Sequence, residues 1–144
     1  MLIRTFRDAD RETVAALWRV VFAGERPHND ADRIFAEKRD VQPELFFVAE
    51  LDGAVVGTCV AGYDGHRGWL YRVAVDPRIQ RRGVGTALVR HAETALLALG
   101  CPKINLQVRA HNAAVVAFYR KLGWEPEELI SLGKLLPRGM GRGA

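Results

Sequence analysis

The strongest constraint on the fold is a helix pattern over residues 83–99 that lies between two strand patterns. Gly100 suits the C-terminal cap of this helix, and Pro102 prevents its continuation. Residues 69–75 before the helix read as a strand, and residues 103–108 after it alternate apolar and polar side chains. A helical crossover between two strands predicts a parallel pair. The helix face expected to be buried consists of Leu88, Ala92, Ala95, Leu96 and Leu99.

Hairpin patterns upstream of this crossover predict antiparallel strands. Residues 45–51 and residues 54–63 are strand-like, and Asp52 and Gly53 between them are typical of a two-residue hairpin turn. Residues 2–6 form a short first strand. Because hairpins and a crossover occur in the same chain, we expect a mixed sheet.

Three more helices are expected to pack on this sheet. The first follows Asp8, a candidate N-cap, and Asp30 begins a second, shorter helix that buries Ile34 and Phe35. Asn112 caps the last helix, which Gly123 closes. The apolar face of the first helix consists of Val14, Leu17, Trp18, Val21 and Phe22.

The end of the chain completes the expected fold. Residues 124–136 are expected to form two final strands, and residues 138–144 a flexible tail. The prediction is therefore an α/β fold in which residues 1–137 form a single domain. Its mixed, twisted sheet has six to seven strands and is flanked on both faces by about four helices.

The composition is that of an ordinary globular protein, with 49% hydrophobic and 26% charged residues. No apolar run is long enough for a membrane span, and residues 1–8 lack the apolar stretch of a secretion signal, so we expect a cytoplasmic protein that does not bind a membrane. Cys59 and Cys101 are expected to be reduced, buried thiols. The four histidines are scattered, so no metal site is expected. The net charge of +4 favours anionic ligands of any kind.

The turn before the long helix is the candidate for chemistry. A helix N-terminus offers unpaired N–H groups and a positive dipole end to phosphate, and Gly83 and Gly85 allow close approach of the backbone. The turn is not a Walker loop, because no Gly-Lys-Ser/Thr follows, and it is not a dinucleotide fingerprint, because position 88 is Leu. Spacing alone leaves a second interpretation open, a tight turn in which Arg81 and Arg82 are simply solvated.

Two signatures in the same order resemble those of the GNAT acetyltransferases. Residues 80–85 (QRRGVG) resemble the signature Gln/Arg-x-x-Gly-x-Gly/Ala. Asn112, Tyr119 and the Leu-Gly pair at 122–123 resemble the second signature, with Trp124 where the family has Phe or Tyr. The resemblance covers the whole chain, and residues 63–68 are similar to a bacterial subgroup of unassigned substrate, the YpeA-type acetyltransferases.

The resemblance implies that acetyl-CoA lies in a V-shaped gap between the fourth and fifth strands, with its pyrophosphate on the N–H groups of residues 81–86. Backbone groups of the fourth strand would pair with the pantetheine arm, and Asn112 would hydrogen-bond the cofactor. Tyr119 would face the sulfur as general acid, since a phenol with the usual pKa of about 10 can give the leaving thiolate a proton. The cofactor-binding residues so implied are Val73, Val75, Gln80, Arg81, Arg82, Gly83, Val84, Gly85, Thr86 and Asn112. Tyr119 also fits a core aromatic, and Asn112 a simple N-cap.

The general base is not identified by the sequence. Related enzymes often carry a Glu on the fifth strand, where this chain has Gln107, which cannot act as a base. Other interpretations are a water relay or an amine that arrives neutral. The remaining candidates each have a structural interpretation as strand, turn or packing residues, and they are Glu50, Asp64, His66 and Tyr71.

The function expected from the resemblance is direct transfer of the acetyl group of acetyl-CoA to a primary amine in a ternary complex. A non-catalytic acyl-CoA-binding module is the alternative, and a nucleic-acid-binding protein is disfavoured because no basic stripe interleaved with aromatics is present. The acceptor, a small-molecule or protein amine, is not identified, and the oligomeric state is open, with a homodimer as one option. The acceptor pocket is expected around Trp18, Phe22, residues 24–32 and residues 125–131.

Overall fold

The computed structural model describes residues 1–24, 30–79 and 81–137. They form two compact units, Met1–Gln107 and Val108–Ala144, and each is described by itself. Three parts of the sequence predictions lie outside the described residues: most of the break after the first helix, Gln80 and the tail at 138–144. The domain limit at residue 137 stays a prediction.

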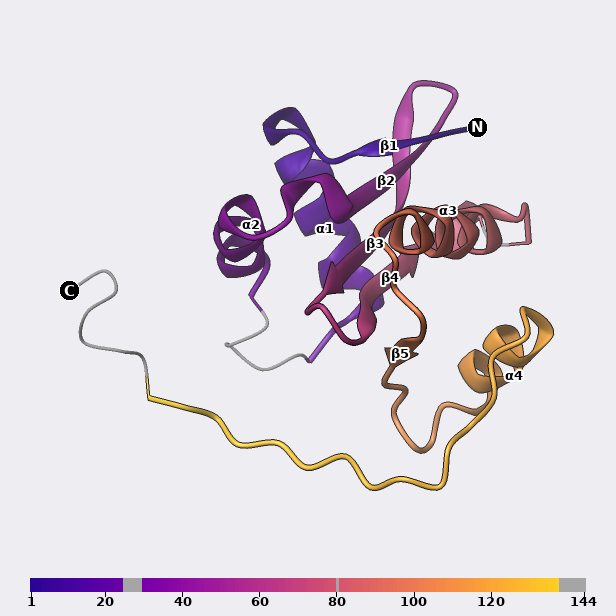
Figure 1. Cartoon of the computed structure of the whole chain (residues 1–144). Helices are drawn as coiled ribbons and strands as arrows, with labels where there is room; N and C mark the ends of the chain where they lie inside the picture. The colour runs from indigo at the N-terminus through magenta and orange to yellow at the C-terminus, as the bar shows by residue number, and fades with distance from the viewer. Residues whose placement is uncertain (25–29, 80, 138–144) are drawn as a thin grey trace. The chain divides into compact units, whose positions relative to one another are not determined.

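The first unit is built on one mixed sheet of five strands in the order β1-β2-β3-β4-β5. Neighbouring strands from β1 to β4 are antiparallel, and β4 and β5 are parallel, as the hairpins and the crossover predict (Figure 1). Asp52 and Gly53 turn from β2 to β3 with φ of 53° and 81°, the left-handed conformation that a two-residue hairpin needs. The strands are β1 (Leu2–Thr5), β2 (Phe46–Leu51), β3 (Ala54–Tyr63), β4 (Gly68–Val75) and β5 (Ile104–Leu106).

Helices cover both faces of this sheet. The helices α1 (Arg11–Val21) and α2 (Ala31–Asp40) lie on one face, and α3 (Val84–Ala98) lies on the other (Figure 1). Neighbouring residues of β2 show the two faces, since Phe46 joins the α1 and α2 core while the Phe47 ring contacts His91 of α3 at 4.7 Å. The core below α1 and α2 consists of Val14, Leu17, Trp18, Phe35, Phe46, Val48, Val60 and Ala74.

The helix α3 buries most of the apolar face that the sequence predicts. Leu88, Ala92 and Leu96 are fully buried, and Ala95 is partly buried. Leu99 is 50% exposed and not buried, because α3 ends at Ala98 and Leu99 is already the cap residue.

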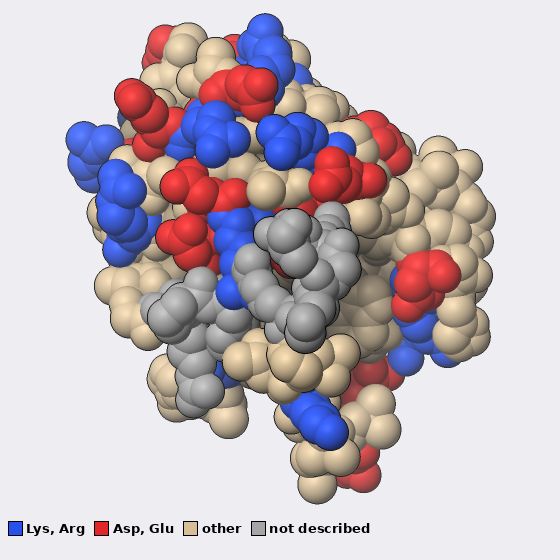
Figure 2. Space-filling model, turned by 90° about the vertical axis from the view of Figure 1, so that its left-hand side faces the viewer, with Lys and Arg blue, Asp and Glu red and all other residues tan. Residues whose placement is uncertain are grey.

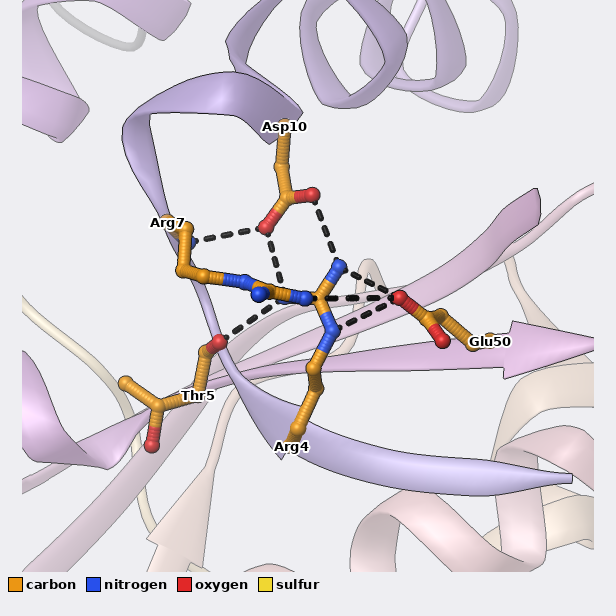
Figure 3. Close-up of polar contacts among 5 residues, drawn as sticks. All are labelled: Arg4, Thr5, Arg7, Asp10 and Glu50. Carbon is orange, nitrogen blue, oxygen red and sulfur yellow. Dashed lines mark hydrogen bonds and ion pairs between the residues drawn. The ribbon is translucent and has the colours of Figure 1, made fainter. Parts of the chain in front are cut away.

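An ion-pair cluster that contains Asp10 holds the start of α1, where the sequence predicts Asp8 as the N-cap (Figure 3). A short 3-10 turn over Asp8–Asp10 precedes α1, so the helix follows Asp10 and the predicted cap at Asp8 is wrong. The Asp10 carboxylate accepts the Arg7 backbone N–H at 2.8 Å and two guanidinium N–H groups of Arg4 at 2.8 and 2.9 Å. This carboxylate therefore ties the start of α1 to β1.

The second unit contains α4 (Ala113–Lys121) and an extended segment. Asn112 caps α4 as predicted, since its side-chain oxygen accepts the Val115 N–H at 3.3 Å. The two strands predicted over residues 124–136 are wrong, because the described residues 124–137 contain none, and the sheet has five strands instead of six or seven. Pro126 cannot donate to a strand ladder, and adjacent apolar pairs such as those at 129–130 and 135–136 break the alternation of a half-buried strand.

Candidate functional site

The turn between β4 and α3 presents an open backbone. A 3-10 turn, Pro77–Ile79, follows β4, and Arg81 and Gly83 then adopt left-handed conformations with φ of 71° and 76°. A Cβ at Gly83 would meet no described atom within 4 Å, so the space beside this residue is open. Arg81 and Arg82 are exposed next to it.

The N-terminus of α3 has N–H groups for which the described residues supply no acceptor. The first helical bond runs from the Ala87 N–H to the Gly83 carbonyl at 3.0 Å, so the N–H groups of Val84, Gly85 and Thr86 lie before the helical ladder begins. Gly83 is the N-cap and offers no side chain to cap them. Residues 81–86 thus form a positive helix end preceded by two exposed arginines, Arg81 and Arg82. Gln80, the first residue of the signature, lies outside the described residues.

One edge of β4 loses its pairing with β5 partway along the strand. Its pairs with β5 run from Gly68 to Leu70, which lies opposite Leu106, and they end there. On the other side β4 stays paired with β3 as far as Val75. Val73 and Val75 therefore lie on the part of β4 beyond the β5 pairing, where the resemblance implies a gap between the fourth and fifth strands.

A β-bulge in the pairing of β4 with β3 lies just beyond the last pair between β4 and β5. Thr58 pairs with Ala74 and Val60 pairs with Tyr71, so two residues of β4 stand opposite Cys59. One of these two, Arg72, has a left-handed φ of 52°, which is uncommon for a residue with a side chain. The sequence analysis did not predict this bulge, because residues 69–71 and 73–75 are continuous apolar runs and show no alternation that a bulge would interrupt.

Arg72 of the bulge contacts two residues of the expected acceptor pocket, Trp18 and Phe22. The Arg72 guanidinium carbon lies 4.4 Å from the Phe22 ring centroid and 5.2 Å from that of Trp18. Trp18 is 3% exposed, so it is a core residue and does not line an acceptor pocket as expected. Its indole is buried because it packs on Phe46 at a ring distance of 5.9 Å.

Asn112 and Tyr119 lie on one helix of the second unit. Tyr119 is about two turns beyond the cap and is 7% exposed. Its ring makes edge contacts with Phe118 at 5.0 Å and with Trp124 at 5.6 Å. Among the described residues nothing accepts a hydrogen bond from the Asn112 amide nitrogen, so this group can donate to a ligand. The roles of both residues toward a cofactor stay predictions.

Two of the candidate bases are engaged in structural contacts. Glu50 accepts the Arg4 Nε–H at 2.8 Å and lies within 3.6 Å of Arg7, so its carboxylate is half-buried in an ion-pair cluster (Figure 3). Asp64 accepts the backbone N–H groups of His66 and Arg67, each at 2.8 Å, and these bonds hold its pKa below the usual value. Neither carboxylate is therefore suited to take a proton from an amine.

The other candidates are less constrained. His66 is exposed in the turn that Asp64 stabilises. Tyr71 on β4 is 46% exposed, and partial burial raises the pKa of its phenol, which disfavours a role as base. Gln107 directly follows β5 and cannot act as a base at any pH.

The thiols are both free and buried. Burial raises the pKa of Cys59 to about 12. The Cys101 Sγ donates to the Lys103 carbonyl at 3.3 Å. Within the described ranges, no group of three His, Cys, Asp or Glu residues could hold a metal ion.

Surface charge bears on nucleic-acid binding, and helix length and apolarity bear on whether a helix can span a membrane. On the face shown in Figure 2, Lys and Arg side chains are interspersed with Asp and Glu, and no field of one sign covers it. Such a face does not resemble a nucleic-acid-binding surface. Of the helices in the described part of the chain, none is long and apolar enough to cross a membrane.

Known proteins resemble this chain over most of its length. Residues 11–124 match the Acetyltransferase (GNAT) family. An acetyltransferase of Yersinia enterocolitica is 45% identical over 136 residues, which cover 94% of this chain and 96% of the relative.

Solved structures share the fold. The ribosomal-protein-S18-alanine N-acetyltransferase from Escherichia coli is 28% identical, with a TM-score of 0.69 over 85% of this chain and 76% of that one. The PaiA N-acetyltransferase from Thermoplasma acidophilum in complex with coenzyme A is 21% identical, with a TM-score of 0.77 over 90% of this chain and 92% of that one.

Proposed function

Because this chain belongs to the GNAT family of acetyltransferases and is therefore an acyltransferase, we propose that it moves the acetyl group of acetyl-CoA directly to a primary amine in a ternary complex. One observation carries the proposal: the open end of α3 adjoins the part of β4 beyond the β5 pairing. Gly57 of β3 touches both, since a Cβ there would lie 3.0 Å from Val84 Cγ1 and 3.0 Å from the Ala74 carbonyl oxygen.

The residues at this junction fit coenzyme A. Its phosphates are anions, and the N–H groups of residues 81–86 with the two exposed arginines offer them hydrogen bonds and positive charge. Gly83 leaves room for this contact, since a side chain would occupy the open space beside it. The pantetheine arm carries amides that can pair with the backbone of Val73 and Val75 as an added half-strand. The PaiA structure supports this assignment, because it holds coenzyme A on the same fold.

Acetyl-CoA supplies an activated thioester, and the residues of the chain hold it and manage the protons. Tyr119 is proposed to donate its phenolic proton to the thiolate that leaves. Its position on the same helix as the Asn112 cap is the spacing of the family signature. Asn112 has an amide N–H group available for the cofactor while its oxygen caps α4.

The amine must lose a proton before or during attack. Glu50 and Asp64 are engaged elsewhere, and Tyr71 has a raised pKa, so we propose that water relays this proton or that the amine arrives neutral. The acceptor class is a primary amine on a small molecule or a protein. The Escherichia coli structural neighbour, for comparison, acts on an alanine of a ribosomal protein.

Release of free thiol from acetyl-CoA in the presence of a panel of amines tests the proposal. An acetyltransferase releases thiol only when a suitable amine is present. The non-catalytic alternative predicts that the chain binds coenzyme A in calorimetry but releases no thiol with any amine. A salt-dependent DNA-binding assay on the same sample would reveal the nucleic-acid-binding alternative.

A further inference from the structure

Two hydrogen bonds in series, one buried and one partly buried, lead from Trp18 to the carbonyl of the left-handed residue Arg72. The Trp18 indole Nε1–H donates to Thr58 Oγ1 at 2.9 Å, and the Thr58 hydroxyl donates to the Arg72 carbonyl at 2.8 Å. An indole N–H can only donate, so the single proton of the Thr58 hydroxyl is directed at the Arg72 carbonyl. Thr58 is fully buried and Trp18 is nearly so, so solvent does not substitute for either bond.

The side chain of Arg72 also contacts Trp18. Its guanidinium lies over the rings of Trp18 and Phe22, at distances typical of cation–π contacts. Trp18 therefore contacts Arg72 twice, directly through its ring and indirectly through Thr58. These contacts link a helix on one face of the sheet to the backbone of one bulged residue in β4.

The bulge decides which backbone groups of β4 point away from β3. Without the extra residue, the strand beyond Arg72 would shift its pairing by one position. The Asp76 N–H donates to the Val56 carbonyl at 2.8 Å, so the alternation along the strand directs the N–H and C=O groups of Val73 and Val75 to the outer edge. The shift in pairing would turn these groups toward β3. The conformation of Arg72 thus selects the hydrogen-bonding groups that the edge offers.

We propose that Trp18 and Thr58 are positioning residues for the cofactor, because they hold the bulge at Arg72 and with it the β4 edge that takes the pantetheine arm. This inference rests on the function proposed above, in which that edge binds coenzyme A. In this proposal neither Trp18 nor Thr58 contacts the cofactor. Their effect on binding passes through the backbone conformation of Arg72.

Removal of the Thr58 hydroxyl tests the inference with little change of shape. Thr58→Val removes the acceptor of the buried Trp18 N–H and the hydroxyl that donates to the Arg72 carbonyl, which disfavours the bulged conformation. Apparent affinity falls in proportion to the population that can bind, and we expect the Kd for coenzyme A to rise about tenfold. Thr58→Ser restores the hydroxyl and should return the Kd to within about twofold of the wild-type value.

Calorimetric titration with coenzyme A is the measurement, beside thermal unfolding of each variant. Leu45→Ala is the control, because Leu45 is 3% exposed in the short 3-10 turn before β2, which lies two strands from β4 in the sheet order. It should lose stability and keep its affinity. Trp18→Phe keeps an aromatic ring beside the Arg72 guanidinium but removes the indole N–H that donates to Thr58. This variant replaces Thr58→Val in the test if Thr58→Val does not fold.

The outcomes separate this inference from the proposed function. Weakened binding in Thr58→Val or Trp18→Phe, with rescue by Ser and unchanged binding in Leu45→Ala, supports the positioning role. Wild-type affinity in both folded variants overturns it, and so does an equal loss in Leu45→Ala. A wild-type protein that does not bind coenzyme A overturns the proposed function, and this inference with it.

Discussion

Leu70 of β4 and Leu106 of β5 form the last pair between these two strands, whereas β4 stays paired with β3 as far as Val75. The left-handed residue Arg72 lies between these two limits. The same strand is thus an interior strand of the sheet at its beginning and is free of its β5 partner at its end. The proposed cofactor site depends on that change.

Gly83→Glu is expected to abolish most coenzyme A binding while the fold persists. The new carboxylate would project into the open space beside the α3 N-terminus, where it would repel phosphate and occupy the free N–H groups. We expect the Kd to rise at least about tenfold, which corresponds to ~1.4 kcal/mol. Calorimetry with coenzyme A on the purified variant checks this.

Gly100→Glu is a matched control for that change. Gly100 follows the other end of α3, also has a left-handed φ of 87°, and a Cβ there would meet no described atom within 4 Å. Both variants put the same charge on the same type of backbone, so both should lose about 1–2 kcal/mol of stability. Only the Gly83 variant should lose affinity, and equal affinities in the two folded variants would remove the turn from the site.

The fold was largely predictable because its main elements carry local signals. Asp52 with Gly53, the apolar face of α3 and the Asn112 cap each specify an element from neighbouring residues alone. The last two strands were not predictable in the same way. Residues 124–136 are apolar enough for strands, but they lack the alternation that distinguishes a strand from an extended segment.

The candidate site was predictable only where a family signature marks it. The Arg72 carbonyl accepts a hydrogen bond from Thr58, which accepts one from Trp18, and both residues are distant in sequence, so no local pattern predicts this arrangement. The ion pair between Arg4 and Glu50 likewise joins two strands that only the folded sheet brings together. Long-range contacts of this kind explain why the sequence left Glu50 among the candidate bases.

Tyr119→Phe is expected to lower kcat while coenzyme A affinity is kept. The variant retains the ring and its contacts with Phe118 and Trp124, and it removes only the proton donor. A positioned acid contributes typically ~10²–10⁴-fold in rate, so the loss should lie in that range. The deficit should shrink with acyl donors whose thiol has a lower pKa. An undiminished kcat, or a deficit independent of that pKa, would make Tyr119 a packing residue.

The combined variant Cys59→Ala and Cys101→Ala is expected to keep its transfer rate. Burial raises the Cys59 pKa to about 12, so the thiol stays protonated and is a poor nucleophile at neutral pH. Loss of two buried side chains should cost on the order of 1 kcal/mol each in stability. Steady-state rates at a temperature where the variant is folded check this. A folded variant that binds acetyl-CoA but does not transfer would point to a route through cysteine.

Acid should destabilise the protein through Asp10. Hydrogen bonds from Arg4 hold the pKa of this carboxyl below its usual range. A carboxyl with a depressed folded pKa stabilises the fold above its unfolded pKa of about 3.9 and loses that contribution as pH falls through the folded value. Asp10→Asn should cost about 1–3 kcal/mol near neutral pH and give a flatter decline below pH ~4. Denaturant unfolding across pH measures both.

Asp32→Asn is the comparison for the acid experiment. Asp32 pairs with Arg11 at 3.3 Å, but its side chain is 78% exposed, and such surface pairs contribute little. Its stability profile should follow the wild type at every pH. If Asp10→Asn also follows the wild type, the cluster in Figure 3 does not stabilise the fold.

The most direct test of the central claim is mass spectrometry of the products formed from acetyl-CoA with an isotopically labelled acetyl group and a panel of primary amines. We expect the label to appear as an amide on at least one amine, formed only when protein, acetyl-CoA and amine are present together, with no label left on the protein. Coenzyme A binding with no labelled amide from any amine would contradict the claim of N-acetyl transfer. A labelled cysteine that passes its acetyl group to the amine would contradict direct transfer in a ternary complex.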